Sequence, residues 1–358
     1  MTWLDDVADR IGPLDAVAVA QATARLDRLT KPPGSLGRLE ALAVQLAGIT
    51  GLALPRDDRP VVVVFAADHG VTAQGVSAYP SDVTAQMVAN FVRGGAAINV
   101  LARLAGAEVV AVDVGVAGPI PGVDARTAGG ARLVSTRVAD GTRDMTHEPA
   151  MTRDETLAAI GAGRAVVMEL LAGGRNVLAV GEMGIGNTTA ASALASVLTG
   201  RPAAEVTGRG TGLDDEATRR KVDVIETALQ GRQPDPADPV DVLAAVGGLE
   251  IAALVGAILA GAEARVPVVL DGFITGAAAL VAAAIAPELP ARLIAGHVSA
   301  EPGHRIVLER LGLRPLLDLE LRLGEGSGAA LALPLLRAAT EILAEMATFD
   351  DAGISGPS

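Results

Sequence analysis

Short runs of β-branched and aliphatic residues recur through the middle of this chain, and they constrain its fold more than any other feature. Each run ends in small and polar residues, and an Ala-rich stretch with helical spacing usually follows it. Strands that alternate with helices are typical of βαβ units, so the pattern predicts a parallel sheet. The five clearest runs are Val61 to Phe65, Val109 to Val114, Val177 to Val180, Val266 to Leu270 and Leu293 to Ala295, and a sixth covers Leu316 to Leu323.

The runs are continuously apolar, which is typical of strands that helices cover on both faces. In sheets of this kind, ligands bind outside the carboxyl ends of the strands. The polar residues that follow the runs are therefore the first candidates for a functional site: Asp68, His69, Glu182, Asp271, His297 and Glu325.

Both ends of the chain have helical spacing instead. Apolar residues recur every three or four positions from Trp3 to Ile49 and again from Gly328 to Met346, as they do on one face of an amphipathic helix. We expect residues 1–50 and 328–358 to form a small helical domain together, and residues 51–327 to form a large α/β domain.

Composition excludes several classes of protein. With 42 acidic against 29 basic side chains the net charge is -13, which disfavours binding to a nucleic-acid backbone. Aromatic residues make up 2% of the chain, too few for a surface that stacks on bases. Because the sequence has no cysteine, it cannot form disulfides, thiolate zinc sites or a cysteine nucleophile.

Neither an export signal nor a membrane span is recognisable. Asp5, Asp6 and Asp9 lie where a secretory signal needs a basic start and an apolar run. The longest uncharged apolar stretches, Ile251 to Ala262 and Gly272 to Ala286, are shorter than the about 18 residues that span a bilayer. We expect both stretches to be buried helices, and the protein to be cytoplasmic without membrane contact.

A glycine-rich segment at residues 181–189, GEMGIGNTT, follows one apolar run and opens an Ala-rich helix. Backbone N–H groups at such a helix start face an anion, so the segment is a candidate phosphate loop. Its spacing matches neither the dinucleotide fingerprint nor the Walker pattern. The alternative is a tight turn that needs glycines, with Thr188 as the helix cap. Glu182 favours a site, because a carboxylate at a strand end is seldom needed for packing.

A second glycine-rich segment, GRGTG at residues 208–212, is flexible enough to wrap a phosphate. A solvated loop is the alternative. Lys221, which lies nearby among acidic residues, is a candidate partner for a phosphate or a ribose. Its alternative is a surface ion pair, which would contribute little.

A third segment, LGEGSG at residues 323–328, places Glu325 between two glycines just before a helix that we expect to begin near Ser327. Flanking glycines let a ligand approach the backbone closely. The carboxylate is either a general base aimed into a largely apolar pocket or a residue that the dipole of the following helix favours.

Neither a metal nor a diphosphate substrate is indicated. Asp271 stands alone before Thr275 and Gly276, where transferases that use magnesium and a phosphoribosyl diphosphate have two adjacent carboxylates. The histidines lack the spacing of metal ligands, and we expect His69 and His297 to orient loops by hydrogen bonds. The prediction is a site without metal or cofactor.

Seven blocks, taken in order, are similar to the nicotinate-nucleotide:dimethylbenzimidazole phosphoribosyltransferases of cobalamin synthesis. The resemblance runs from about residue 20 to residue 345. It implies a three-layer α/β/α fold with a mainly parallel Rossmann-like sheet, a small helical domain from both chain ends, and a homodimer. The blocks are KPPGSLGRLE at 31–40, AADHGV at 66–71, GEMGIGNTT at 181–189, GRGTG at 208–212, DGFITGAA at 271–278, HVSAEPGH at 297–304 and LGEGSGAALA at 323–332.

The resemblance also implies a reaction and its residues. The family transfers the 5-phosphoribosyl group of nicotinate mononucleotide to 5,6-dimethylbenzimidazole, giving α-ribazole 5′-phosphate and nicotinate. Glu325 matches the family's general base, and Glu182 would lie near the ribose or the leaving ring. The substrate-binding residues that it implies are Gly184, Gly186, Asn187, Gly210, Lys221, Asp271 and Ser299, with Gln86, Tyr79 and Met87 bordering the benzimidazole.

Two other functions stay open on the residues alone. A non-catalytic nucleotide sensor would use the same phosphate loops, and a phosphoribosyltransferase with a diphosphate donor would need magnesium. A dinucleotide dehydrogenase is disfavoured because the glycine fingerprint does not follow Phe65.

Overall fold

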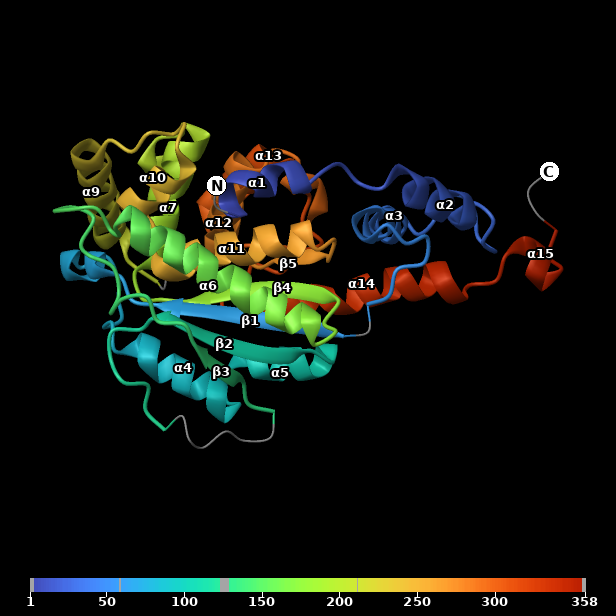
Figure 1. The fold of residues 1–358 in the computed structure, drawn as a ribbon, viewed down its shortest axis with the longest axis horizontal. Helices are drawn as coiled ribbons and strands as arrows, with labels where there is room; N and C mark the ends of the chain where they lie inside the picture. Colours follow the sequence, from blue (N-terminus) through green and yellow to red (C-terminus); the bar gives the residue numbers. More distant parts are fainter. Residues whose placement is uncertain (1–2, 58, 123–128, 211, 356–358) are drawn as a thin grey trace.

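A sheet of six parallel strands forms the centre of the computed structural model, which describes residues 3–57, 59–122, 129–210 and 212–355 (Figure 1). The strand order is β3-β2-β1-β4-β5-β6, the order of a doubly wound Rossmann sheet. The predicted α/β fold is therefore confirmed. The strands are β1 (Pro60–Ala67), β2 (Glu108–Gly115), β3 (Arg132–Ser135), β4 (Val177–Met183), β5 (Val268–Leu270) and β6 (Leu293–Ala295).

The structure confirms five of the predicted strands and shows that the prediction of the sixth was wrong. In the segment Leu316 to Leu323, only β8 (Leu317–Asp318) is a strand, and it pairs with β7 (His297–Val298) in a separate two-stranded sheet. The remaining strand of the main sheet is β3. The sequence analysis missed it because four residues that are partly or fully exposed do not make a continuous apolar run.

Two layers of helices cover the sheet, which makes the predicted three-layer α/β/α arrangement. One layer contains α1 (Trp3–Arg10), α6 (Arg153–Ala172), α7 (Asn187–Thr199), α8 (Ala203–Val206), α9 (Asp215–Arg232), α10 (Pro239–Val246), α11 (Leu249–Glu263), α12 (Phe273–Ile285) and α13 (Pro302–Leu311). The other contains α2 (Ala16–Leu26), α3 (Arg38–Thr50), α4 (Val83–Arg93), α5 (Ala97–Ala105) and α14 (Ser327–Glu345). The short elements are η1 (Gly70–Gln74), η2 (Leu289–Arg292) and α15 (Phe349–Ala352).

Strand β1 shows why helices are needed on both faces. Val61, Val63 and Phe65 belong to one hydrophobic core, whereas Val62 and Val64 belong to the other. Successive side chains of a strand point to opposite faces, so an apolar run can be buried only between two layers. The apolar stretches expected as buried helices are α11 and α12, and both lie inside the first layer.

Helix α14 joins the two ends of the chain. It contacts α5 and strand β4 as well as α2 and α3, and Figure 1 shows α2, α3 and α15 at the end of the molecule away from the tip of the β1 arrow. Among the described residues, α14 is the one helix long and apolar enough to cross a membrane, and 56% of its apolar stretch is buried inside the protein.

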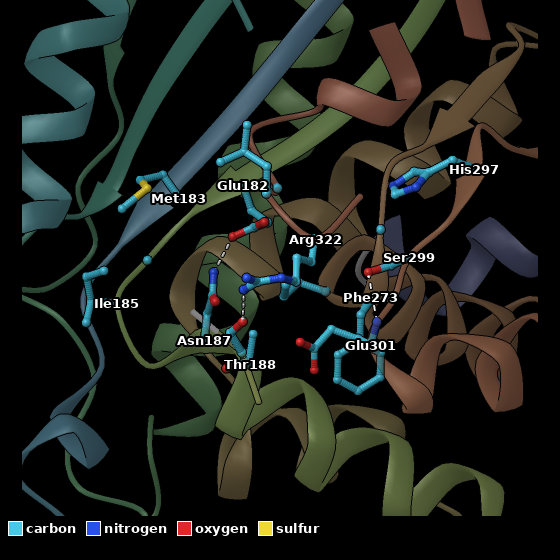
Figure 2. Close-up of a pocket in the computed structure, with 16 residues that line it drawn as sticks. Glu182, Met183, Ile185, Asn187, Thr188, Phe273, His297, Ser299, Glu301 and Arg322 are labelled. Carbon is cyan, nitrogen blue, oxygen red and sulfur yellow. Dashed lines mark hydrogen bonds between the residues drawn. The ribbon is translucent and has the colours of Figure 1, made fainter. Parts of the chain in front are cut away.

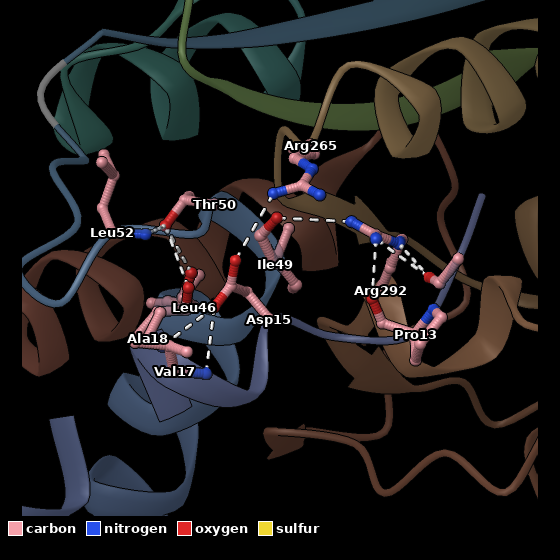
Figure 3. Close-up of polar contacts among 12 residues, drawn as sticks. Pro13, Asp15, Val17, Ala18, Leu46, Ile49, Thr50, Leu52, Arg265 and Arg292 are labelled. Carbon is pink, nitrogen blue, oxygen red and sulfur yellow. Dashed lines mark hydrogen bonds and ion pairs between the residues drawn. The ribbon is translucent and has the colours of Figure 1, made fainter. Parts of the chain in front are cut away.

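Polar contacts hold the segment around residues 12–15 against the rest of the chain (Figure 3). Arg292 donates hydrogen bonds to the carbonyl oxygens of Gly12 (2.9 Å), Pro13 (3.0 Å) and Ile49 (3.3 Å). Asp15 caps α2, because its side chain accepts from the first backbone N–H groups of that helix. Helix α1 packs on α11. The division into residues 1–50 with 328–358 and residues 51–327 stays a prediction.

Candidate active site

The carboxyl ends of β1 and β4 lie side by side at the centre of the sheet, where the strand order reverses. In doubly wound sheets this switch point forms the crevice for ligands. A pocket opens there, and its described lining comes from several loops (Figure 2). It brings together five of the predicted site residues, Glu182, Gly184, Asn187, Gly210 and Ser299, and adds Thr188, Glu301 and Arg322.

Glu182 lies within β4, because that strand continues to Met183. Its carboxylate accepts a hydrogen bond from the Asn187 side chain. The pKa of Glu182 is raised to about 8, chiefly by burial and also by the negative charges of Asp271, Glu250 and Glu325, while the hydrogen bond from Asn187 opposes the shift. This carboxyl group is therefore protonated at neutral pH, and a cationic ligand beside it would ionise it.

The loop after β4 turns sharply into α7. Gly186 has a φ of 94°, in the left-handed region, and it is the residue that caps α7. The expectation that Thr188 caps this helix was therefore wrong. A Cβ on Gly184 would lie 2.5 Å from the carbonyl oxygen of Ala67, so close packing requires glycine there. The N–H groups of Asn187 and Thr189 donate to the carbonyl oxygens of Gly184 and Gly186, so only part of this helix start is available to an anion.

Lys221 is buried behind the pocket. Its exposed fraction is 0%, which excludes the surface ion pair, and its Nζ donates a hydrogen bond to Thr188 Oγ1 at 2.7 Å. A Cβ on Gly210 would lie 3.4 Å from that Nζ, so the second glycine-rich segment closes over the lysine. Arg322 donates to the carbonyl oxygen of Gly210 at 3.2 Å. Thr211 lies outside the described residues.

The loop that carries Glu325 packs against Glu182. Gly324, Glu325 and Gly326 have φ values of 84°, 64° and 85°, which are costly for a residue with a side chain. The N–H of Glu325 donates to the carbonyl oxygen of Glu182 at 3.2 Å. A Cβ on Gly324 would lie 2.4 Å from Glu182 Oε1. The two candidate carboxylates therefore belong to one packed unit.

The Glu325 carboxylate is 5% exposed and lies at the start of α5, where its Oε2 accepts a hydrogen bond from the N–H of Ile98 at 3.3 Å. The helix that it contacts is thus not the one that follows it, and the expectation of a first-turn residue of α14 was wrong. Burial and the charge of Asp271 raise the pKa of Glu325, while the Ile98 hydrogen bond opposes the shift. A raised pKa suits a general base near neutral pH.

Asp271 holds the Glu325 loop in place. It is 1% exposed and accepts hydrogen bonds from three backbone N–H groups around the start of α14, those of Gly326, Gly328 and Ala329. His297 approaches the same carboxylate at 3.5 Å. Asp271 is not among the described residues that line the pocket, so the structure places it beneath the site.

His69 makes the expected kind of contact after β1. Its Nε2 lies 2.6 Å from Glu250 Oε1, and both side chains are almost fully buried. Glu250 and Asp68 raise the pKa of His69 against the opposite effect of burial, which is the largest. His69 and Glu250 therefore form a buried pair next to the loop after β4, where a Cβ on Gly184 would lie 2.9 Å from Glu250 Oε1.

A second pocket lies beside the first, after β1 and β2. Its described lining includes Gln86, Asp68 and Ser81. Two of the three residues expected around the benzimidazole are not among the described residues that line it. Tyr79 is 52% exposed, and Met87 packs against the hydrophobic core on the α14 side of the sheet.

Sequence reasoning missed three residues of the crevice. Glu301 and Arg322 line the first pocket. Glu301 follows β7 and the predicted residue Ser299, and Arg322 lies at the end of the segment Leu316 to Leu323, so their positions were usable signals. Glu250 begins a helix and follows no strand, and no pattern in the sequence marks it.

The fold and the crevice define a class of protein: a Rossmann-like α/β protein whose switch point joins a helix start and a buried lysine to two coupled carboxylates, as in nucleotide-binding enzymes. A family model described as phosphoribosyltransferase, DBI_PRT, matches residues 11–354. The chain belongs to this family of phosphoribosyltransferases.

Individual relatives are similar to this chain over almost its whole length. The protein named nicotinate-nucleotide–dimethylbenzimidazole phosphoribosyltransferase of Chloroflexus aggregans is 57% identical over 355 residues, 99% of either chain. The protein of the same name from Roseiflexus sp. is 55% identical over 356 residues, also 99% of either chain. The crystal structure of CobT from Thermus thermophilus has a TM-score of 0.90 and 51% identity, and it covers 95% of this chain and 100% of its own.

Proposed function

We propose that this chain transfers the 5-phosphoribosyl group of nicotinate mononucleotide to 5,6-dimethylbenzimidazole, giving α-ribazole 5′-phosphate and nicotinate. The observation that carries the proposal is the contact between Glu182 and the loop of Glu325 at the switch point, beside a pocket with a buried lysine. The names of the relatives, which share more than half of their residues with this chain, support the same reaction.

The donor fits the first pocket by charge. Its phosphate would lie near Lys221, Thr188 and Gly210, where the ammonium group and the helix start favour an anion. Its positively charged pyridinium ring would lie toward Glu182, where the carboxylates Asp271 and Glu325 add negative charge. The phosphate and the positive ring nitrogen of the donor are therefore drawn toward different parts of the pocket, which orients the donor.

The reaction needs one proton to be removed. The bond between C1′ and the pyridinium nitrogen breaks, and its electron pair makes that nitrogen neutral. The unprotonated ring nitrogen of the benzimidazole forms the new bond to C1′. Glu325 then acts as the general base and accepts the proton that the other ring nitrogen loses. Gln86 in the second pocket would hold the polar edge of the acceptor.

Three further parts of the proposal come from the resemblance and the chemistry. No metal or cofactor takes part, because the leaving group is cationic before it departs. The protein acts as a homodimer, which light scattering after gel filtration would test. It works in the cytoplasm on small molecules, without a nucleic-acid or membrane partner.

Incubation with nicotinate mononucleotide and a panel of aromatic bases, followed by mass spectrometry, tests the function. We expect nicotinate and a ribosylated base phosphate with 5,6-dimethylbenzimidazole, and undiminished release of nicotinate after chelation of divalent metals. Binding of the nucleotide without turnover would indicate a sensor instead. A strict need for magnesium and a phosphoribosyl diphosphate would indicate the other class of transferase.

A further inference from the structure

Lys221 is a buried cation with little to compensate its charge. It is 0% exposed, and its Nζ donates a hydrogen bond to the neutral hydroxyl of Thr188. Burial disfavours the charged form of a lysine and lowers the pKa of Lys221 to about 8. A cation that is to receive a phosphate is useful only if it is charged before the phosphate arrives.

Glu301 supplies a negative charge at the same place. It is 7% exposed and lines the pocket together with Thr188, and Figure 2 shows its carboxylate on the side of the pocket across from that residue. Its buried Oε2 makes no hydrogen bond to any described residue. Its charge raises the pKa of Lys221 against the larger effect of burial.

The backbone of Glu301 is held by its neighbours, and its carboxylate lies against the glycine-rich loop. The N–H of Glu301 donates to Ser299 Oγ at 3.2 Å, and Pro302 follows as the first residue of α13. A Cβ on Gly208 would lie 2.0 Å from Glu301 Oε2. The absence of a side chain at residue 208 therefore leaves room for this carboxylate beside the glycine-rich loop.

Arg322 lines the same pocket and donates to the carbonyl oxygen of Gly210, and most other charged groups near Lys221 face solvent. Burial and Glu301 are the influences that act on its pKa. The exposed charged residues on the elements around it are Glu205 on α8, Arg209 in the glycine-rich loop, Asp241 on α10, and Asp215, Glu216, Arg219, Arg220, Asp223 and Glu226 on α9 itself, where Arg232 is partly buried.

We propose that Glu301 is the resident counter-charge of Lys221 and keeps the lysine an ammonium group before the donor binds. A carboxylate repels a phosphate, so Glu301 is a positioning residue rather than a ligand of the donor. Once the donor is bound, its phosphate takes over as the negative charge that stabilises the ammonium group of Lys221. The inference rests on the proposed function in one respect, that Lys221 receives the phosphate of the donor.

The test is the pH dependence of kcat/KM for nicotinate mononucleotide in Glu301→Gln. Without the carboxylate, Lys221 should lose its proton at lower pH, so we expect the alkaline limb of the profile to move down by about one pH unit. At acidic pH, where Lys221 is charged in both enzymes, KM for the donor should not rise. Glu301→Asp keeps the charge and should keep the alkaline limb close to that of the wild type.

Glu309→Gln is the matched control. It removes the same charge from an exposed position on α13, the helix that Glu301 precedes, and we expect no shift of the profile. An unshifted alkaline limb in Glu301→Gln, or a KM that rises by the same factor at every pH, would overturn the proposal and leave Glu301 a structural residue.

A second measurement does not depend on the glutamine variant folding. In the wild-type protein the Nζ signal of Lys221, assigned by comparison with Lys221→Arg, should show an ammonium group at neutral pH. A neutral amine there would overturn the proposal. If no nicotinate is released from the donor under any condition, the proposed function fails, whereas this titration still tests the pair.

Discussion

Replacing Asp271 by alanine should release the loop that carries Glu325. Asp271 is 1% exposed, and its carboxylate accepts hydrogen bonds from the N–H groups of Gly326 (3.1 Å), Gly328 (2.6 Å) and Ala329 (3.2 Å). The first turn of a helix has no internal partners for its N–H groups. In Asp271→Ala all three lose their acceptor inside the protein.

The expected cost follows from these three bonds. A hydrogen bond to a charged group contributes about 1.5–3 kcal/mol, and loss of a helix cap costs about 0.5–2 kcal/mol. Because the bonds share one carboxylate and are not additive, we expect the free energy of unfolding to fall by about 4 kcal/mol. With an unfolding entropy of about 2.1 cal/mol/K per residue, or about 0.75 kcal/mol/K for 358 residues, Tm should fall by about 5 °C.

Thermal unfolding and steady-state release of nicotinate measure the two effects. A displacement of about 1 Å at a reacting group costs about 100-fold in rate, so we expect a loss of that order in turnover. Asp140→Ala is the control, because that side chain is 73% exposed and pairs on the surface with Arg137. A variant at position 271 with unchanged Tm, or with lowered Tm and full turnover, would refute the role given to Asp271.

Two further predictions concern the same crevice. In Gly181→Ala the new Cβ would lie 2.3 Å from the N of Gly326, so we expect a loss of about 1–3 kcal/mol in stability and slower nicotinate release. Gly161→Ala, where nothing lies within 4 Å of a Cβ, should leave Tm unchanged or raise it; equal effects of the two substitutions would contradict the clash. Glu182 keeps its proton to a pH of about 8 when folded but ionises near its ordinary pKa of 4.5 when unfolded, so its contribution to stability falls as pH rises between these values. The Tm of Glu182→Gln relative to wild type should therefore rise over that range, and a constant difference would show that Glu182 is not held protonated.

The sheet could be predicted because burial on both faces leaves a local mark in the sequence. An apolar run such as Val61 to Phe65 has no polar position to expose, so it fits only a covered strand. The segment Leu316 to Leu323 was grouped with these runs although Asp318, Glu320 and Arg322 interrupt it. Leu319 and Leu323 are 53% and 56% exposed, so no core covers the segment.

The sequence predicts those residues of the candidate site that directly follow a strand, and not the others. Glu182 and Ser299 follow the parallel-sheet rule, and the structure brings them to one pocket. Whether a carboxylate faces a ligand or a backbone depends on the path of its loop, and no sequence pattern records that path. Two residues show where prediction from the sequence fails. Asp271 binds backbone N–H groups instead of lining the pocket, and Tyr79 is not among the described residues that line either pocket.

The most direct test of the central claim is the turnover of Glu325→Gln with nicotinate mononucleotide and 5,6-dimethylbenzimidazole. The glutamine keeps the size of the side chain but cannot take the proton of the acceptor. We predict unchanged binding of the nucleotide by calorimetry and a loss of at least about 100-fold in kcat. Wild-type kcat in this variant would contradict the assignment of Glu325 as the base.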